Sequence, residues 1–194
     1  PLLEIALSGR TELTERLHAE DTDTWRLFHG AAEGRPGLTV DRYGDRVLVQ
    51  TFRELLGAGE LGTIQRAVGQ ECVWRHRGPG HATDNAPPDW AVEAQPFREL
   101  GIGYEAPLVH RGQDPWLFLD LRAARRWIGR HAEGLDVLNT FAYTGGAGLV
   151  AAKAGAAAVT QLDHGGWCLG AERRLAEHNG LRTDQLQVDF IVAM

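Results

Sequence analysis

Apolar residues in the second half of the chain recur in short runs that are separated by longer amphipathic segments. The runs Asp136–Phe141, Ala157–Leu162 and Leu186–Val192 predict strands. Between them, Ala147–Ala154 and Trp167–Asn179 have the length and pattern of helices. An alternation of strand, helix, strand, helix and strand is typical of a parallel sheet with crossover helices. The pattern therefore predicts an α/β fold for this half of the chain.

The first half of the chain has a different pattern of apolar positions, in which predicted strands follow one another directly. Apolar positions on each side of Gly9 predict one or two helical turns. The dipeptides Pro36-Gly37 and Gly44-Asp45 supply turns between short apolar runs. The predicted elements after the helical turns are strands Trp25–His29, Leu38–Asp41 and Arg46–Phe52, a helix from about Gly62 to Gly69, and a strand Cys72–His76. This order predicts a small α+β unit.

An irregular segment rich in proline and glycine, Arg77–Pro88, is the clearest compositional break. After it, Glu99–Tyr104 predicts a further strand. Asp120 is placed to cap the helix that follows it. We therefore predict two domains, residues 1–95 and residues 96–194.

A glycine-rich turn follows the first strand of the predicted parallel sheet, within the stretch VLNTFAYTGGAGLVAA. Gly145, Gly146 and Gly148 stand where this strand passes into a helix, and glycine there permits positive φ and close approach of a ligand. Seventeen residues beyond Gly146, the next strand ends in Asp163. In a parallel sheet that carboxylate lies beside the turn, where it can accept two hydrogen bonds from a ribose. Turn and acid together predict a site for a nucleoside cofactor.

Two cofactor classes fit this arrangement. The spacing Gly146-x-Gly148-x-x-Ala151 matches the dinucleotide fingerprint of nicotinamide and flavin enzymes, a weak pattern on its own. S-adenosylmethionine has the same adenosine ribose and no pyrophosphate. Hydrophobic periodicity does not choose between the two.

Composition narrows the class of protein. The 194 residues are 43% apolar and carry 20 basic against 26 acidic residues, a formal charge of −6. The balance argues mildly against a nucleic-acid partner, although local basic patches occur at Arg75–Arg77 and within Arg122–Arg130. No apolar run approaches the roughly 20 residues that span a bilayer, and no secretory signal follows Pro1.

The cysteines and histidines point to no disulfide and no metal. Cys72 and Cys168 are too few for a disulfide framework and form no CxxC pair, which favours a reduced, cytoplasmic protein. Cys72, His76 and His81 are loosely grouped but lack a fourth ligand at zinc-site spacing. We predict no metal site.

Three blocks of the chain, in the same order, match the motifs of one known family. LDVLNTFAYTGGAGLVAAKAGAAAVTQLDH…AEHNGL, from residue 135 to 181, is similar to VLNxFxYTGGFxxxAxxxGAxxVxxVDxS…NxxLNGL. WRLFHGAAEGRPGLTVDRYGDRVLVQ, residues 25–50, is similar to RLxxGExDGLPGLxVDRYGxxLVVQ, and LFLDLRAARRW, residues 117–127, to GFFLDQRxNR. On these blocks the chain resembles the bacterial 23S rRNA 5-methylcytosine methyltransferases of the large-subunit methyltransferase I type.

The resemblance implies a Rossmann-like class I methyltransferase core, preceded by a small α+β domain that presents RNA. It implies S-adenosylmethionine as cofactor and RNA, specifically 23S rRNA, as partner. Asp163 would hold the adenosine ribose. The other cofactor-binding positions that it implies are Thr144, Gly145 and Gly146 under the amino-acid end, Asn139, Phe141 and Tyr143 around that pocket, and Asp120 and Arg122 at its border.

Departures from the family motifs leave other functions open. Asp114 stands where a basic side chain is usual, Leu121 replaces a glutamine, and Gly165 replaces the serine after the acid. The family's nucleophilic cysteine lies on later strands, so we expect it after Met194 and assign no catalytic residue. The alternatives are an NAD-dependent oxidoreductase that uses the same turn, and a catalytically inert RNA-binding homologue.

Overall fold

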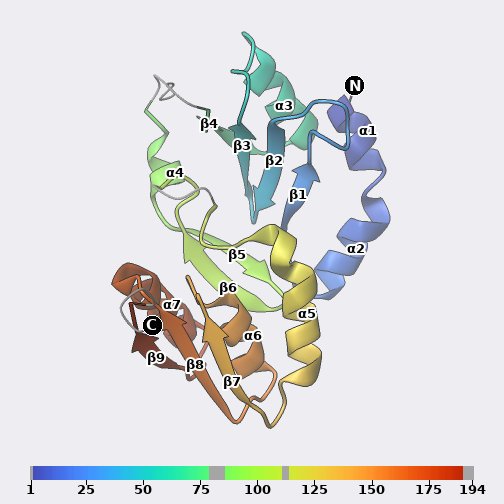
Figure 1. The fold of residues 1–194 in the computed structure, drawn as a ribbon. Coiled ribbons are helices and arrows are strands. Elements are labelled where there is room, and N and C mark those ends of the chain that lie inside the picture. Colours follow the sequence, from blue (N-terminus) through green and yellow to red (C-terminus); the bar gives the residue numbers. More distant parts are fainter. Residues whose placement is uncertain (1, 79–85, 111–113, 190–194) are drawn as a thin grey trace. The chain divides into compact units, whose positions relative to one another are not determined.

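The computed structural model describes residues 2–78, 86–110 and 114–189, and the chain divides into two compact units, residues 1–115 and 116–194 (Figure 1). The division lies about twenty residues later than the domain boundary that we placed between residues 95 and 96. Among the described residues, no helix has the length and apolar character that crossing a membrane requires.

The first unit is built on a four-stranded sheet in the order β1-β2-β3-β4. Its strands are β1 (Thr24–Phe28), β2 (Leu38–Tyr43), β3 (Arg46–Thr51) and β4 (Glu71–His76). The first three pair antiparallel, whereas β3 and β4 pair parallel because α3 (Glu60–Val68) carries the chain back across the sheet. The helices α1 (Leu2–Ser8) and α2 (Thr11–Ala19) confirm the helical turns predicted on each side of Gly9. The sequence therefore predicted the elements of this sheet to within two residues.

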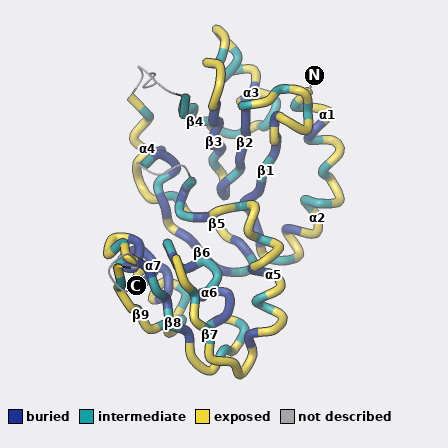
Figure 2. The backbone as a smooth tube through the Cα atoms, viewed as in Figure 1, coloured by how far each residue is buried: buried dark blue, intermediate teal, exposed yellow. Residues whose placement is uncertain are grey.

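The core of this unit lies where the helices cover the sheet. Figure 2 shows β2 and β3 as mostly buried, and their alternating Val40, Val47 and Val49 side chains have no exposed surface. Leu17 from α2 and Ile64 from α3 pack into the same cluster. The sheet and the helices thus bury one continuous apolar face.

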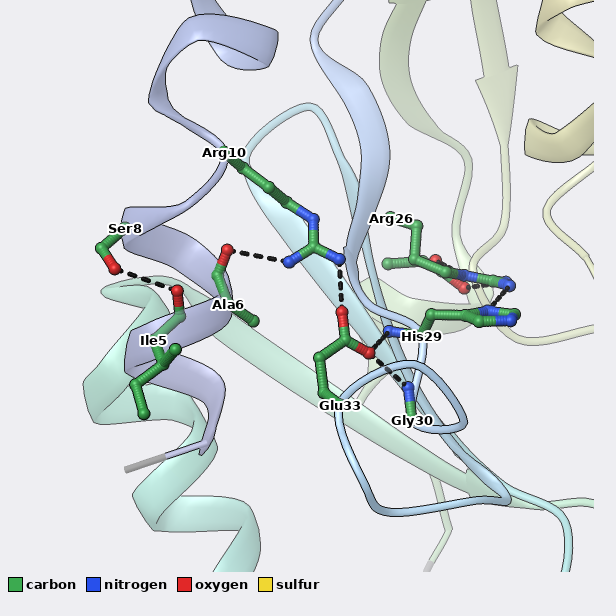
Figure 3. A network of polar contacts seen from close by, with 9 residues as sticks. Ile5, Ala6, Ser8, Arg10, Arg26, His29, Gly30 and Glu33 are labelled. Atoms are coloured by element: carbon green, nitrogen blue, oxygen red, sulfur yellow. Dashed lines mark hydrogen bonds and ion pairs between the residues drawn. The ribbon is translucent and has the colours of Figure 1, made fainter.

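A carboxylate closes the loop between β1 and β2. Glu33 accepts hydrogen bonds from the backbone N–H groups of His29 (3.0 Å) and Gly30 (2.9 Å) and from the Arg10 guanidinium (2.5 Å) (Figure 3). Arg10 also donates to the carbonyl of Ala6 at 2.8 Å. One guanidinium therefore ties both N-terminal helices to this loop.

Next to this loop, an ion pair crosses from β1 to β2. Arg26 and Asp41 are partners in the antiparallel register, and two guanidinium nitrogens meet the two carboxylate oxygens at 2.7 and 3.0 Å. Burial raises the pKa of Asp41, and the hydrogen bonds from Arg26 oppose that rise. The pair keeps a charge inside the sheet that burial alone would disfavour.

A hairpin replaces the single strand that we predicted at Glu99–Tyr104, so that prediction is wrong. The strands β5 (Gln95–Glu99) and β6 (Ile102–Ala106) pair antiparallel through a two-residue turn, Leu100-Gly101, whose φ angles are +53° and +66°. Such turns favour Asn-Gly, and leucine gives no signal for one. The Leu100 N–H donates to the Thr22 hydroxyl at 2.8 Å, a contact from a distant segment that stabilises the bend. A short helix, α4 (Asp89–Val92), precedes the hairpin.

The second unit is a parallel three-stranded sheet in the order β7-β8-β9, as the alternation of elements predicted. Its elements are a 3₁₀ turn η1 (Leu119–Leu121), α5 (Arg122–His131), β7 (Asp136–Thr140), α6 (Gly146–Lys153), β8 (Ala158–Asp163), α7 (Gly166–His178) and β9 (Asp184–Gln187). The helices α6 and α7 cover one face, where Val159, Gln161 and Asp163 of β8 are buried (Figure 1). Leu138 and Leu186 lie on the opposite face and are exposed.

Two local predictions in this unit are wrong. Asp120 lies within η1, and the first residue of α5 follows Leu121, with no side-chain capping bond. The last strand starts at Asp184 and ends at Gln187, earlier than the predicted Leu186–Val192, whose final residues lie outside the described ones. The apolar run misled the prediction, because polar glutamine side chains of β9 bond to α7 and its preceding loop and so fix the strand.

Candidate cofactor site

The turn after β7 has an unusual backbone. Phe141, Tyr143 and Gly145 have φ angles of +56°, +53° and +80°. Left-handed conformations cost roughly 1–2 kcal/mol for residues other than glycine, and such strain is concentrated at functional sites. Glycine at 145 was expected to take this conformation. The two aromatic residues were expected only to shape the pocket, and nothing in their residue type signals the strain.

Asp163 fixes this turn to the end of β8. Its Oδ2 accepts the N–H of Tyr143 at 2.9 Å, and its Oδ1 accepts the N–H of Gly165 at 2.8 Å. The Asp163 side chain is only 8% exposed. The acid and the glycine turn therefore touch directly, whereas their sequence spacing predicted only that they lie side by side.

Other predicted positions lie within the turn or next to it. Thr144 is buried, and its hydroxyl donates to the carbonyl of Trp116. Gly145 is the residue before α6, which begins at Gly146 without a side-chain cap. Asn139 on β7 donates to Gln161 at 2.8 Å. The helix thus presents its N-terminal backbone N–H groups, which favour negative or electron-rich ligand atoms.

An open pocket of about 240 Å³ adjoins this turn. Five of the predicted positions line it: Asn139, Phe141, Tyr143, Thr144 and Gly146. Asp163 and Gly145 do not line it, and Asp120 and Arg122 flank Leu121, which does line the pocket. The structure therefore gathers five of the nine predicted residues around one cavity.

Aromatic rings that the sequence analysis did not select stand at the same place. Tyr143 has its ring centroid 5.4 Å from that of Phe118 and 5.6 Å from that of Trp167, the latter edge to face. Phe118 and Trp167 are 44% and 57% exposed, and Phe141 is 70% exposed. Exposed ring faces of this kind can stack on a flat heterocycle. Only their shared position at the carboxyl end of the parallel strands could have signalled them.

Arg125 is a second residue that the sequence analysis placed elsewhere. We grouped it with a surface basic patch, but it is buried and donates to the carbonyl of Phe118 at 2.8 Å. It lines the same pocket. Its guanidinium therefore holds the segment before α5 at the cavity wall.

Neither cysteine has the character of a catalytic nucleophile. Burial raises the pKa of the Cys72 thiol to about 12 and, together with the charge of Asp163, that of Cys168 to about 11. The reactive form of cysteine is the thiolate, which is scarce at such pKa values. Both side chains pack in their units as apolar residues.

We therefore expect the thiols to label at pH 8 more slowly than free cysteine, by a factor of at least about 100 for Cys168 and about 1000 for Cys72, because their thiolate fractions are reduced to that extent. The measurement is the rate of absorbance change with a disulfide reagent, before and after unfolding in urea. Labelling of one cysteine in the folded chain at the unfolded rate would contradict the assignment.

Within the described ranges, no three His, Cys, Asp or Glu side chains are grouped so as to hold a metal ion. His81, the last member of the loose group with Cys72 and His76, lies outside the described residues. The candidate site described above is formed by backbone, carboxylate and aromatic rings.

Comparison with known proteins identifies the fold and the family. The chain is 34% identical over 190 residues to a ribosomal RNA large subunit methyltransferase of Deinococcus radiodurans, and covers 46% of that protein with 90% of its own length. It is 31% identical over 200 residues to the ribosomal RNA large subunit methyltransferase I of Aeromonas hydrophila, covering 49% of it with 95% of its own length. The chain thus spans about half the length of these relatives.

A solved structure and a family match agree with these relatives. A structure described as a candidate methyltransferase complexed with S-adenosylhomocysteine superposes with a TM-score of 0.81 at 23% identity, over 99% of this chain and 51% of that one. The Rossmann-like fold that the motifs implied is thereby confirmed. Residues 25–192 match the family described as S-adenosylmethionine-dependent methyltransferase. Because this match covers most of the sequence, the chain belongs to the S-adenosylmethionine-dependent methyltransferase family.

Proposed function

We propose that this chain forms the cofactor-binding part of an S-adenosylmethionine-dependent methyltransferase that acts on large-subunit ribosomal RNA. The observation that carries the proposal is the bond from the Tyr143 N–H to Asp163, which joins the glycine turn to the carboxylate at the end of β8. The relatives are named as methyltransferases of that RNA, and they supply the substrate class.

The donor and acceptor groups of the site fit S-adenosylmethionine. Each Asp163 oxygen is engaged in one backbone hydrogen bond, Oδ1 also lies 3.3 Å from Nδ1 of His164, and an ionised carboxylate offers about four acceptor sites in all. We assign the remaining acceptor capacity of this residue to the hydroxyls of the adenosine ribose. When bound, the cofactor supplies an electrophilic methyl group.

The remaining predicted residues form three groups, which occupy three different parts of the site. Thr144, Gly145 and Gly146 lie at the start of α6, and we assign them to the amino-acid end of the cofactor. Asn139, Phe141 and Tyr143 form the wall of the pocket, with the exposed rings beside them. Asp120 and Arg122 are assigned to its border.

The sequence motifs support a more specific proposal for the substrate. We propose 23S rRNA as partner, cytosine C5 as the methylated atom, and the cytoplasm as the compartment. Residues 1–95 would present the RNA, and residues 96–194 would bind the cofactor. Methylation at cytosine C5 requires a thiolate nucleophile, and the raised pKa values of Cys72 and Cys168 leave this role unassigned.

Calorimetric titration of the chain with S-adenosylhomocysteine and with NAD tests the cofactor assignment. We expect binding of S-adenosylhomocysteine only, and an affinity about 100-fold lower for Asp163→Ala, because two hydrogen bonds to a charged acceptor are lost. Asp136→Ala removes an exposed carboxylate at the opposite end of β7 and should bind like the parent chain. Binding of NAD alone would instead support an oxidoreductase.

An inert RNA-binding homologue is distinguished by methyl transfer. The protein in its full natural length is expected to transfer a tritiated methyl group from S-adenosylmethionine to unmethylated ribosomal RNA. RNA binding without transfer would favour the inert homologue.

A further inference from the structure

A row of polar side chains crosses the covered face of the parallel sheet, beneath the glycine turn. Asn139, Gln161 and Gln185 are register partners on β7, β8 and β9. Gln161 is fully buried. Its Oε1 accepts from Asn139 at 2.8 Å, so its amide nitrogen must point the other way. We call the set Asn139, Gln161, Gln185 and Glu172 the polar ladder.

Glu172 on α7 is the acceptor on which this ladder converges. It is fully buried and receives hydrogen bonds from Gln161 (3.1 Å), Thr183 (2.8 Å) and Gln185. The Gln185 oxygen in turn accepts from Arg173 at 2.6 and 3.1 Å, so the orientation of this amide is fixed as well. The amide groups of Gln161 and Gln185 therefore each have one orientation in which all of their hydrogen bonds form.

The ladder ends on the backbone of the glycine turn. The Gln161 amide nitrogen donates to the carbonyl of Gly145 at 3.1 Å, and the same carbonyl accepts the N–H of Leu149 at 2.9 Å. Because a trans peptide places C=O and N–H on opposite sides, this double anchor turns the N–H of Gly146 away from the ladder. Gln161 thereby sets the direction of the first N–H of α6.

The ladder also explains two of the glycines. A Cβ built on Gly145 would lie 2.2 Å from Cγ of Glu172 and 2.8 Å from the Gln161 amide nitrogen. A Cβ on Gly148 would lie 2.3–2.5 Å from the Gln161 amide group. Gly148 therefore makes room for a buried amide, so one glycine of the dinucleotide-like spacing has a packing role that needs no pyrophosphate.

We propose that Gln161, oriented by Glu172, is a positioning residue for the cofactor site. It holds the glycine turn in its binding conformation from beneath and does not touch the ligand. The proposal rests on the proposed function, because the ligand is the cofactor assigned above.

Gln161→Met tests the positioning role, since it keeps the length of the side chain and removes its hydrogen bonds. We expect the affinity for S-adenosylhomocysteine to fall at least tenfold, measured by calorimetry where urea titration shows the chain folded. Val159→Ala is the matched control, because Val159 is buried on the same face of β8 but lies away from the turn. It should lower the urea midpoint and change the affinity less than twofold.

The contact itself is tested by a double substitution. Gly148→Ala and Gln161→Ala are each expected to lower the urea midpoint, and together to lower it by less than the sum of the two shifts, because the smaller residue 161 removes the clash.

The outcomes are separable. Unchanged affinity in Gln161→Met, or equal losses in Gln161→Met and Val159→Ala, would overturn the positioning role while the proposed function stands. Additive midpoint shifts would overturn the packing that we infer between residues 148 and 161. No binding of S-adenosylhomocysteine by the parent chain would overturn the proposed function and the positioning role together.

Discussion

Gly145→Ala is expected to destabilise the second unit by about 2–4 kcal/mol and to abolish cofactor binding. The left-handed backbone at this position costs alanine roughly 1 kcal/mol. The new Cβ would also lie 2.2 Å from Cγ of the buried Glu172, and overpacking of this kind costs typically 1–3 kcal/mol. The turn can relieve the clash only by moving the residues that we assign to the cofactor.

A matched control separates these two causes. Gly134 has a φ of +71°, and a Cβ there would meet no atom within 4 Å. Gly134→Ala should therefore show the backbone cost of about 1 kcal/mol alone. Urea unfolding of both variants and titration with S-adenosylhomocysteine give the measurements. Equal stability losses in the two variants would mean that Glu172 does not restrict the turn.

Arg26→Ala is the second change with a large expected effect, a loss of about 2–3 kcal/mol in the first unit at pH 7. Removing one partner of a buried pair leaves an uncompensated charge, which costs about 3–5 kcal/mol when both groups are fully buried. The side chain of Asp41 is 1% exposed, but that of Arg26 is 37% exposed, so water can reach the vacated side and reduce the loss. Unfolding in urea at pH 7 measures it.

The loss of stability in Arg26→Ala should become smaller as the pH falls. Burial raises the pKa of Asp41 above that of the unfolded chain, and without Arg26 nothing on β1 opposes the rise with a full charge. The folded variant therefore binds a proton more tightly than the unfolded one, and its stability recovers as pH falls from 7 toward about 4.

An exposed pair provides the comparison. Arg98 and Asp21 lie 3.0 Å apart with both side chains more than half exposed. Arg98→Ala should change stability by no more than about 1 kcal/mol. A constant loss for Arg26→Ala between pH 4 and 7 would contradict the role of Asp41.

Sequence reasoning identified the sheet of the second unit because strand and helix periods differ. It also placed Asp163 beside the glycine turn, since parallel strands end at one edge. The hairpin at Leu100 and the left-handed Phe141 and Tyr143 escaped it for a common reason. Bonds to distant segments, from Leu100 to Thr22 and from Tyr143 to Asp163, hold conformations that the residue types do not favour, and Phe141 lies in the same turn as Tyr143.

Other errors in the predictions arose where polar residues occupy positions that pattern analysis expects to be apolar. The strand at Asp184–Gln187 has little hydrophobic pattern, and its amides bond to α7 or the loop before it. Gln161 and Glu172 likewise give no periodic signal, although both are fully buried. Pattern analysis assumes that buried positions are apolar, so it overlooks a polar core whose donors and acceptors are matched.

The polar ladder also constrains how this protein can diverge. Because a Cβ on Gly148 would lie in the space of the Gln161 amide, a larger residue at 148 is tolerated only if residue 161 has become smaller first, whereas Gly145 is restricted chiefly by Glu172. A change at Glu172 likewise removes the shared acceptor of hydrogen bonds from Gln161, Thr183 and Gln185. We therefore expect these positions to vary in concert in related sequences, because a change at one alters the space or the hydrogen-bond partners of the others.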